Sequence, residues 1–150
     1  MFFGPREGYN ERVNNGKKIS VFIADDSPLI RERLRSLLTE IPEAEVIGEA
    51  GNGVEALVSI HRIKPDVVIL DIQMPGDSGI DIVRHLRKSG VKPVSIILTN
   101  YSYRHNTRAS FEVGANYFLD KSRDFEKIKP IIGMLAVCGE GKHASSPPET

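Results

Sequence analysis

The chain is short of the features that mark secreted, membrane and nucleic-acid-binding proteins. It has one cysteine, Cys138, so it cannot form an internal disulfide bond, which fits a reducing compartment. Its 20 lysines and arginines are matched by 20 aspartates and glutamates, so its net charge favours neither nucleic acid nor an anionic membrane. No apolar run is long enough to span a bilayer or to form a signal peptide near the first residue. We therefore predict a cytoplasmic protein that binds no nucleic acid and no membrane.

Length and composition predict one compact domain with a tail at each end. A chain of 150 residues with 40% hydrophobic and 27% charged residues is typical of a single globular domain. Residues 1–17 are rich in glycine, asparagine and charge and predict a flexible N-terminal segment. Residues 138–150 predict a disordered C-terminal tail. The domain is therefore expected over residues 18–137.

Between the tails, strand patterns alternate with helix patterns. Runs of β-branched and aliphatic residues predict five strands, at 19–26, 44–50, 65–71, 92–100 and 114–120. Apolar residues at helical spacing predict five helices, at about 28–40, from after the turn at 51–53 to about 63, at 77–90, at 103–113 and from about 124 onward. Ser27 is the expected N-cap of the first helix, Gly90 lies past the end of the third, and Pro130 is expected to kink the last or to end a first segment of it. This alternation predicts an α/β fold, a doubly wound five-stranded parallel sheet with right-handed crossovers.

Polar residues stand at the predicted carboxyl ends of four strands. These residues are Asp25 and Asp26, Asp71, Thr99 and Lys121. In doubly wound sheets ligands bind at this edge, so the five side chains are expected to converge there. Carboxylates packed together repel one another unless a cation lies among them, and carboxylate and carbonyl oxygens suit Mg²⁺.

Such a group of side chains has the parts that phosphoryl transfer requires. Asp71, ionised at neutral pH, can act as a nucleophile without a general base. Mg²⁺ and Lys121 can neutralise phosphoryl oxygens, to which Thr99 can donate a hydrogen bond.

Each of these residues also has a structural explanation. Asp25 and Asp26 can cap the next helix, and Asp71 can be an ordinary turn residue. Thr99 is common in strands, and a lysine such as Lys121 is usually solvated. The functional interpretation depends on their joint placement at consecutive strand ends.

The chain resembles bacterial response-regulator receiver domains over about residues 18–137. The resemblance rests on four features, the Asp25–Asp26 pair, DIQMPG at 71–76, Thr99 at the end of IILTN, and GANYFLDK at 114–121. Lys121 follows Thr99 by 121 − 99 = 22 residues, as in the chemotaxis member of the family. The resemblance implies a flavodoxin-like (βα)5 fold with strand order 2-1-3-4-5.

The resemblance also implies a role for each residue of the site. Asp71 is implied as the phosphoacceptor, with a histidine kinase or a phosphotransfer protein as the donor. Asp25, Asp26, Asp71 and the backbone carbonyl of Gln73 are implied as ligands of Mg²⁺. Thr99 and Lys121 are implied to contact the phosphoryl group.

The resemblance further implies a conformational switch. Thr99 is expected to move toward the phosphoryl group while Phe118 turns inward, which remodels the face of the fourth helix, fifth strand and fifth helix for a downstream partner. Without the resemblance, Phe118 would be interpreted as a core aromatic. Gln73 and Tyr101 stand two residues beyond Asp71 and Thr99, and they are expected to tune the lifetime of the phosphoryl group, Tyr101 by shielding it.

Two features fall outside the family pattern. Ser122 follows Lys121 where many receivers have a proline in a cis peptide bond, so we expect a trans bond and a different loop here. Arg104, His105 and Arg108 form a basic cluster on the fourth predicted helix, which is either a solvated face or a contact for an acidic partner.

The sequence thus predicts a single-domain signalling switch that is not an enzyme. The alternatives are a receiver fragment of a larger regulator, a phosphorylation-independent binding module, and a phosphatase with an aspartyl-phosphate intermediate. Phosphatases of the haloacid dehalogenase class usually place a second acid where this chain has Gln73. The sequence names neither the kinase nor the output, and it does not decide between a monomer and a phosphorylation-dependent homodimer.

Overall fold

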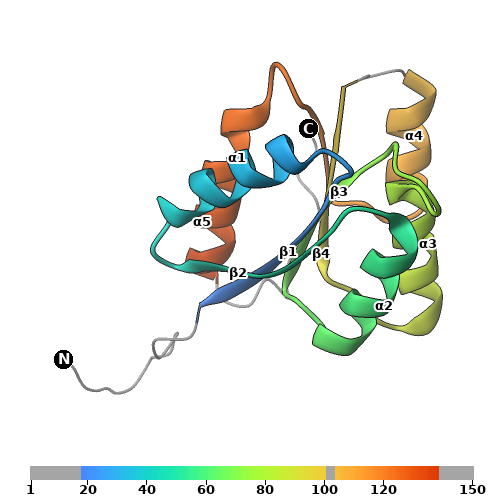
Figure 1. Cartoon of the computed structure of the whole chain (residues 1–150), viewed down its shortest axis with the longest axis horizontal. Coiled ribbons are helices and arrows are strands. Elements are labelled where there is room, and N and C mark those ends of the chain that lie inside the picture. The colour runs from blue at the N-terminus through green and yellow to red at the C-terminus, as the bar shows by residue number, and fades with distance from the viewer. Residues whose placement is uncertain (1–17, 101–103, 139–150) are drawn as a thin grey trace.

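The computed structural model describes residues 18–100 and 104–138, which form one five-stranded parallel sheet with helices on both faces (Figure 1). The strand order is β2-β1-β3-β4-β5, as the resemblance to receiver domains implies. The strands are β1 (Ile19–Ala24), β2 (Ala44–Ala50), β3 (Val67–Asp71), β4 (Val94–Thr99) and β5 (Tyr117–Asp120). The predicted flexible segment 1–17, Tyr101 and residues 139–150 lie outside the described residues.

Both faces of the sheet are covered by helices. α1 and α5 cover one face, and α2, α3 and α4 lie on the other (Figure 1). The helices are α1 (Pro28–Thr39), α2 (Gly53–Ile63), α3 (Gly79–Ser89), α4 (Arg104–Glu112) and α5 (Ile128–Cys138), with a 3₁₀ turn, η2 (Phe125–Lys127), before α5. Cys138, which the sequence assigns to the tail, is the last residue of α5.

The core has two halves because side chains alternate across the central strands. In β1, Val21 and Ile23 pack in the half beneath α1 and α5, whereas Phe22 and Ala24 pack in the half beneath α2 and α3. Every residue of β3 and β4 is buried. Burial on both faces explains why these strands read as continuous apolar runs rather than as alternating ones.

The expected helix boundaries hold where a cap fixes them. Ser27 accepts a hydrogen bond from the backbone N–H of Ile30 at 3.2 Å, and Gly90 ends α3 with φ of 88°. α3 begins two residues later than predicted because Ser78 is its N-cap and forms a capping box with Asp81.

Several boundaries differ from the prediction by a few residues, and near the C-terminal end of the fold two differences have a local reason. β5 begins at Tyr117 rather than at residue 114 because Gly114, with φ of 107°, turns the chain after α4. Pro130 does not divide α5, which is continuous from Ile128 to Cys138. It lies in the first turn of α5, where its missing N–H has no partner within the helix.

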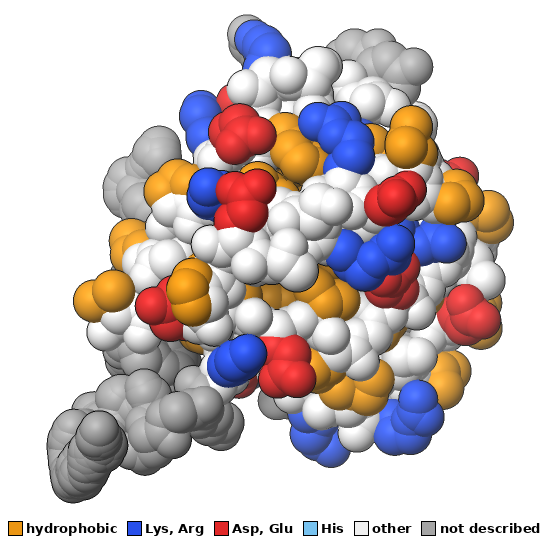
Figure 2. All heavy atoms as spheres, turned by 60° about the vertical axis from the view of Figure 1, so that its left-hand side comes forward, with side chains coloured by type: hydrophobic (Ala, Val, Ile, Leu, Met, Phe, Trp, Pro, Cys, Tyr) orange, Lys and Arg blue, Asp and Glu red, His pale blue; other side chains and the backbone are white. Residues whose placement is uncertain are grey.

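The surface mixes charges of both signs. On the face shown in Figure 2, acidic and basic side chains are interspersed with hydrophobic ones. Within residues 18–100 and 104–138, no helix is both long and apolar enough to cross a membrane.

A glycine fixes the start of α2 against the loop that follows β3. The backbone N–H of Gly53 donates to the carbonyl of Pro75 at 2.9 Å. A Cβ atom at Gly53 would overlap the backbone carbonyl of Asp77. Since the clash is with backbone, no side-chain rotation can relieve it.

We therefore predict that Gly53→Ala lowers the free energy of unfolding by roughly 2 kcal/mol or more, because the loop must shift. Gly133→Ala is the matched control, since Gly133 lies within α5 and a Cβ there meets nothing within 4 Å. The control is expected to raise stability by about 0.5–1 kcal/mol through helix propensity. Urea denaturation measures both free energies of unfolding. If the two substitutions change the free energy of unfolding equally, the close approach of Gly53 to the backbone of Asp77 is contradicted.

Candidate functional site

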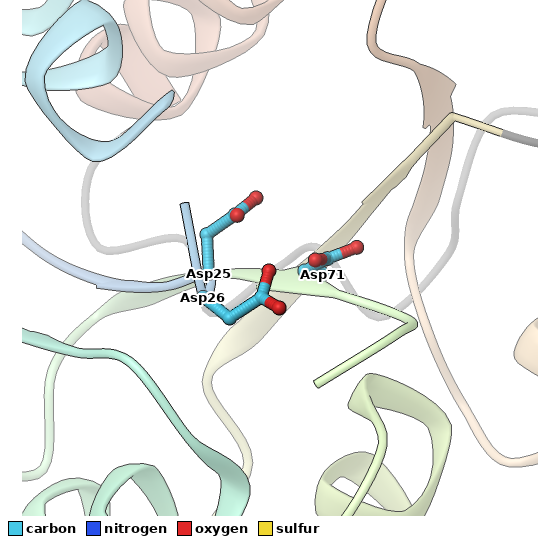
Figure 3. Close-up of side chains that lie close together, drawn as sticks. All are labelled: Asp25, Asp26 and Asp71. Carbon is cyan, nitrogen blue, oxygen red and sulfur yellow. The ribbon is translucent and has the colours of Figure 1, made fainter. Parts of the chain in front are cut away.

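Three carboxylates meet at the carboxyl edge of the sheet. Asp25 and Asp26 directly follow β1, and Asp71 is the last residue of β3, the strand beside β1. One oxygen from each carboxylate lies within 4.8 Å of the others (Figure 3). The strand order therefore brings together residues that stand 46 positions apart (71 − 25) in the sequence.

Asp25 is buried and held by the backbone. Its Oδ1 accepts a hydrogen bond from the N–H of Ser27 at 2.9 Å, and its own N–H donates to the carbonyl of Ala50 at 3.1 Å. Its Oδ2 is buried and makes no hydrogen bond within the described part of the chain. The Nζ of Lys121 lies 2.8 Å from that oxygen, so the contact is an ion pair without hydrogen-bond geometry.

Asp71 is also buried, and it shares the same lysine. Its side chain is 5% exposed, and its Oδ2 lies 3.3 Å from Nζ of Lys121. The N–H of Gln73 donates to Oδ1 at 3.2 Å. Burial, together with the charge of Asp25, raises the pKa of Asp71 to about 6, although Lys121 and the Gln73 hydrogen bond act in the opposite direction. Positive charge within the site is thus insufficient to keep Asp71 at its ordinary pKa.

Lys121 is a buried lysine rather than a solvated one. Its side chain is 8% exposed. Its backbone N–H donates to the carbonyl of Thr99 at 2.7 Å, which ties the end of β5 to the end of β4. Thr99 itself is buried at the end of β4. The strand-end residues named from the sequence are therefore gathered at one edge.

The loop after Lys121 contains no proline at residue 122, and its conformation is held by hydrogen bonds to two carboxylates. Oδ1 of Asp120 accepts from the N–H of Ser122 at 2.8 Å, from its Oγ at 3.0 Å and from the N–H of Arg123 at 3.0 Å. The N–H of Asp120 donates to Oδ2 of Asp124 at 2.9 Å. As expected from Ser122, none of the peptide bonds in the described segments is cis. The role of Asp120 was not foreseen, although an aspartate two residues before a serine is typical of such side-chain turns.

The remaining residues singled out in the sequence lie around this edge. Gln73 is exposed and reaches Asp71 through its backbone. Phe118 is half-buried on β5 and packs against the core half beneath α2 and α3. Arg108 is exposed on α4, while the side chains of Arg104 and His105 lie outside the described residues.

The donor atoms fit a divalent cation. If all are ionised, three carboxylates and one lysine carry a net charge of −3 + 1 = −2. Oxygens around Mg²⁺ at about 2.1 Å stand at most about 4.2 Å apart. The 4.8 Å spread of the carboxylate oxygens is close to that value, so small side-chain rotations suffice. The buried Oδ2 of Asp25 accepts no hydrogen bond and has the ammonium of Lys121 beside it, so it too lies in a position suited to a positive charge.

The pKa of Asp71 predicts how its replacement changes stability with pH in the absence of metal. Between about pH 4 and pH 6 the native state keeps a proton on Asp71 that the unfolded state has lost, because the pKa rises from 3.8 to about 6 on folding. This difference makes the folded wild type less stable as pH rises through that window. Asp71→Asn lacks the effect, so its stability advantage in a chelator should be larger at pH 7.5 than at pH 5 by about 1 kcal/mol. Urea denaturation at the two pH values measures the advantage, and a pH-independent difference would contradict the raised pKa.

Comparison with known proteins agrees with this geometry. The chain is 41% identical over 114 residues to a protein-glutamate methylesterase/protein-glutamine glutaminase from Carboxydothermus hydrogenoformans, a match that covers 74% of this chain and 33% of that one. It is 41% identical over 106 residues to the nitrate/nitrite response regulator protein NarP of Escherichia coli, covering 71% of this chain and 49% of NarP. The chain thus spans half or less of the length of these curated relatives.

Solved structures share the fold over most of the chain. The signal receiver domain of NarL from Mycobacterium tuberculosis superposes with a TM-score of 0.75 and 28% identity, covering 81% of this chain and 98% of that one. The response regulator domain of CheB from Thermotoga maritima gives a TM-score of 0.72 and 25% identity, covering 83% and 98%. The family model described as the response regulator receiver domain matches residues 21–132. The chain therefore belongs to the response regulator receiver domain family of two-component signalling.

Proposed function

We propose that this chain is a phosphorylation-dependent switch that receives a phosphoryl group on Asp71 from a histidine kinase or a phosphotransfer protein. The observation that carries the proposal is the pairing of the buried Asp71 carboxylate with Lys121 beside two further acids. A purely structural ion pair needs one carboxylate for one lysine, and it gains nothing from the two extra acids. A site that must hold a cation and a phosphoryl group together uses all of them.

In this proposal, Asp25, Asp26, Asp71 and the backbone carbonyl of Gln73 would hold Mg²⁺. The ion, when bound, supplies charge neutralisation for phosphoryl oxygens and lowers the pKa of Asp71. Asp71 is then ionised at neutral pH and needs no separate base.

The transfer itself asks for positioning more than for covalent chemistry from the protein. An oxygen of the Asp71 carboxylate forms the new bond to phosphorus as the bond from phosphorus to the donor histidine nitrogen breaks. The N–H of Gln73 holds Oδ1 of Asp71, and the ammonium of Lys121 lies beside Oδ2. Lys121 is therefore close enough to pair with an equatorial phosphoryl oxygen after transfer.

We further propose that Thr99 and Phe118 form the conformational switch. Thr99 ends β4, and Phe118 pairs in register with Ile97, two residues earlier on that strand. Because side chains alternate along strands, Phe118 and Thr99 belong to the same face of the sheet, the one covered by α2, α3 and α4. A shift of Thr99 toward the phosphoryl group would open space that Phe118 can enter. The surface of α4, β5 and α5 would then change its affinity for a downstream protein.

The chain acts in this proposal as a switch rather than as an enzyme with a substrate of its own. Its matched relatives include both a methylesterase and a transcriptional regulator, and the match covers only 33% to 49% of their length. The same switch within a larger regulator would control whatever domain accompanies it. The proposed setting is the cytoplasm, as the sequence leads us to expect.

The test is intact-protein mass spectrometry after incubation with acetyl phosphate and Mg²⁺. The wild type is expected to gain the mass of one phosphoryl group, and the gain should vanish in Asp71→Asn and in the presence of a chelator. Asp66→Asn is the matched control. Asp66 immediately precedes β3, at the end of the strand opposite to Asp71, so its substitution should leave the labelling intact.

Two outcomes would contradict the proposal. Labelling that persists in Asp71→Asn would place the phosphoacceptor elsewhere. A complete lack of labelling, under conditions that label another receiver domain, would favour a phosphorylation-independent binding module.

A further inference from the structure

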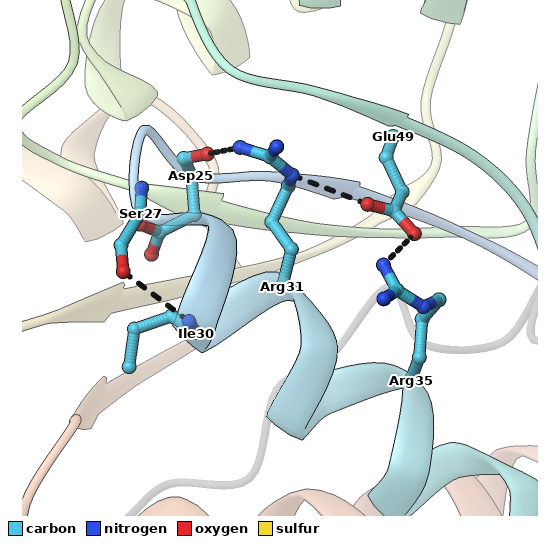
Figure 4. Close-up of polar contacts among 6 residues, drawn as sticks. All are labelled: Asp25, Ser27, Ile30, Arg31, Arg35 and Glu49. Atoms are coloured by element: carbon cyan, nitrogen blue, oxygen red, sulfur yellow. Dashed lines mark hydrogen bonds and ion pairs between the residues drawn. The ribbon is translucent and has the colours of Figure 1, made fainter.

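An arginine of α1 contacts the backbone between the two acids of the site. The guanidinium of Arg31 donates from NH1 to the carbonyl oxygen of Asp25 at 2.7 Å, and from Nε to Oε1 of Glu49 on β2 at 3.1 Å (Figure 4). The side chains of Arg31 and Glu49 are only 22% and 24% exposed. Gly51 leaves room for this arrangement, since a Cβ there would lie 3.2 Å from NH1 of Arg31.

The carbonyl of Asp25, to which Arg31 donates, lies between the two acidic residues of the pair. It belongs to the peptide unit that joins Asp25 to Asp26, and a peptide unit is planar. A hydrogen bond that fixes this carbonyl therefore fixes the plane from which both acidic residues extend. On the other side of the same turn, the N–H of Ser27 holds Oδ1 of Asp25. Arg31 thus completes the restraint of the turn that carries the acidic pair.

We propose that Arg31 is a positioning residue that orients the Asp25–Asp26 peptide so that both carboxylates face Asp71, and thereby raises the affinity of the site for Mg²⁺. The inference rests on the proposed function, because it concerns the same metal site. It adds a residue that touches neither the cation nor the phosphoryl group and acts through the backbone.

Electrostatics alone predicts the opposite effect, which makes the inference testable. A positive guanidinium near an acidic site repels a cation, so its removal should tighten Mg²⁺ binding if charge dominates. Glu49 pairs with Arg31 and reduces that repulsion. Loss of the orienting hydrogen bond should instead weaken Mg²⁺ binding. The sign of the change therefore separates the two effects.

Arg35 offers a matched control on the same helix. Its guanidinium pairs with Oε2 of Glu49, one turn beyond Arg31, and it carries the same charge. Arg35 bonds to Glu49, whereas Arg31 bonds to both Glu49 and the Asp25 carbonyl. Arg35→Gln removes one charge and one bond to Glu49 but leaves the bond to the acidic turn in place.

The experiment titrates Mg²⁺ into the unphosphorylated full chain by isothermal titration calorimetry, for wild type, Arg31→Gln and Arg35→Gln. We expect the Kd for Mg²⁺ to rise roughly 10-fold in Arg31→Gln, as for other residues that orient metal ligands, and to stay within about 2-fold in Arg35→Gln. Labelling by acetyl phosphate gives a second readout. The Mg²⁺ concentration for half-maximal rate should rise in Arg31→Gln, while the rate at saturating Mg²⁺ stays near that of the wild type.

Each outcome decides the matter. Mg²⁺ binding by Arg31→Gln that equals or exceeds that of wild type overturns the inference while leaving the proposed function intact. Absence of Mg²⁺ binding in the wild type overturns both. If urea denaturation shows that Arg31→Gln does not fold, Arg31→Lys replaces it. This variant keeps the positive charge but lacks the guanidinium that bonds to both Glu49 and the Asp25 carbonyl, so the Kd should rise, whereas an unchanged Kd overturns the inference.

Discussion

The mutual repulsion of Asp25, Asp26 and Asp71 is the constraint on which the organisation of this molecule depends. Their oxygens lie within 4.8 Å of one another, and one buried lysine contacts two of them. Burial, together with the charge of Asp25, raises the pKa of Asp71, so its ionised form is held in the folded chain at a cost. Such a cluster persists only on a scaffold that is stable without it, which here is the two-sided apolar core around the central strands. The stored repulsion is relieved by a cation, so affinity for one follows from the same geometry.

The scaffold holds the charged groups mainly through backbone atoms. Asp25 accepts from the N–H of Ser27, and Asp71 accepts from the N–H of Gln73. Lys121 is fixed by its own N–H, which donates to Thr99, and by the turn that Asp120 closes behind it. Backbone donors cannot be protonated or rotated away, so the site stays in place when its charge changes. The proposed switch assigns the movement to the side chains of Thr99 and Phe118.

The sheet and the site edge were predictable because their signals are local. Apolar runs that end in Asp25, Asp71 and Thr99 fix both the strands and the residues at their ends, and parallel pairing then brings those ends together. Residues that act across the fold gave no such signal. Arg31 is one of several arginines on an amphipathic helix, and only its contact with the Asp25 carbonyl sets it apart. From the sequence, Gly53 is interpreted as a turn glycine. In the structure a glycine is needed there because any side chain would clash with the backbone of Asp77, which lies 24 residues further on (77 − 53).

The measurement that tests this account most directly is the melting temperature of the wild-type protein in a chelator and then at rising Mg²⁺ concentrations, at neutral pH. If the acidic cluster is short of positive charge, Mg²⁺ binds the folded chain and the melting temperature should climb by a few degrees, continuing to rise as its concentration passes the Kd. Asp71→Asn should show a smaller rise, because one charge of the cluster is gone. A wild-type melting temperature that does not respond to Mg²⁺ would show that Lys121 alone balances the site, and it would contradict the account.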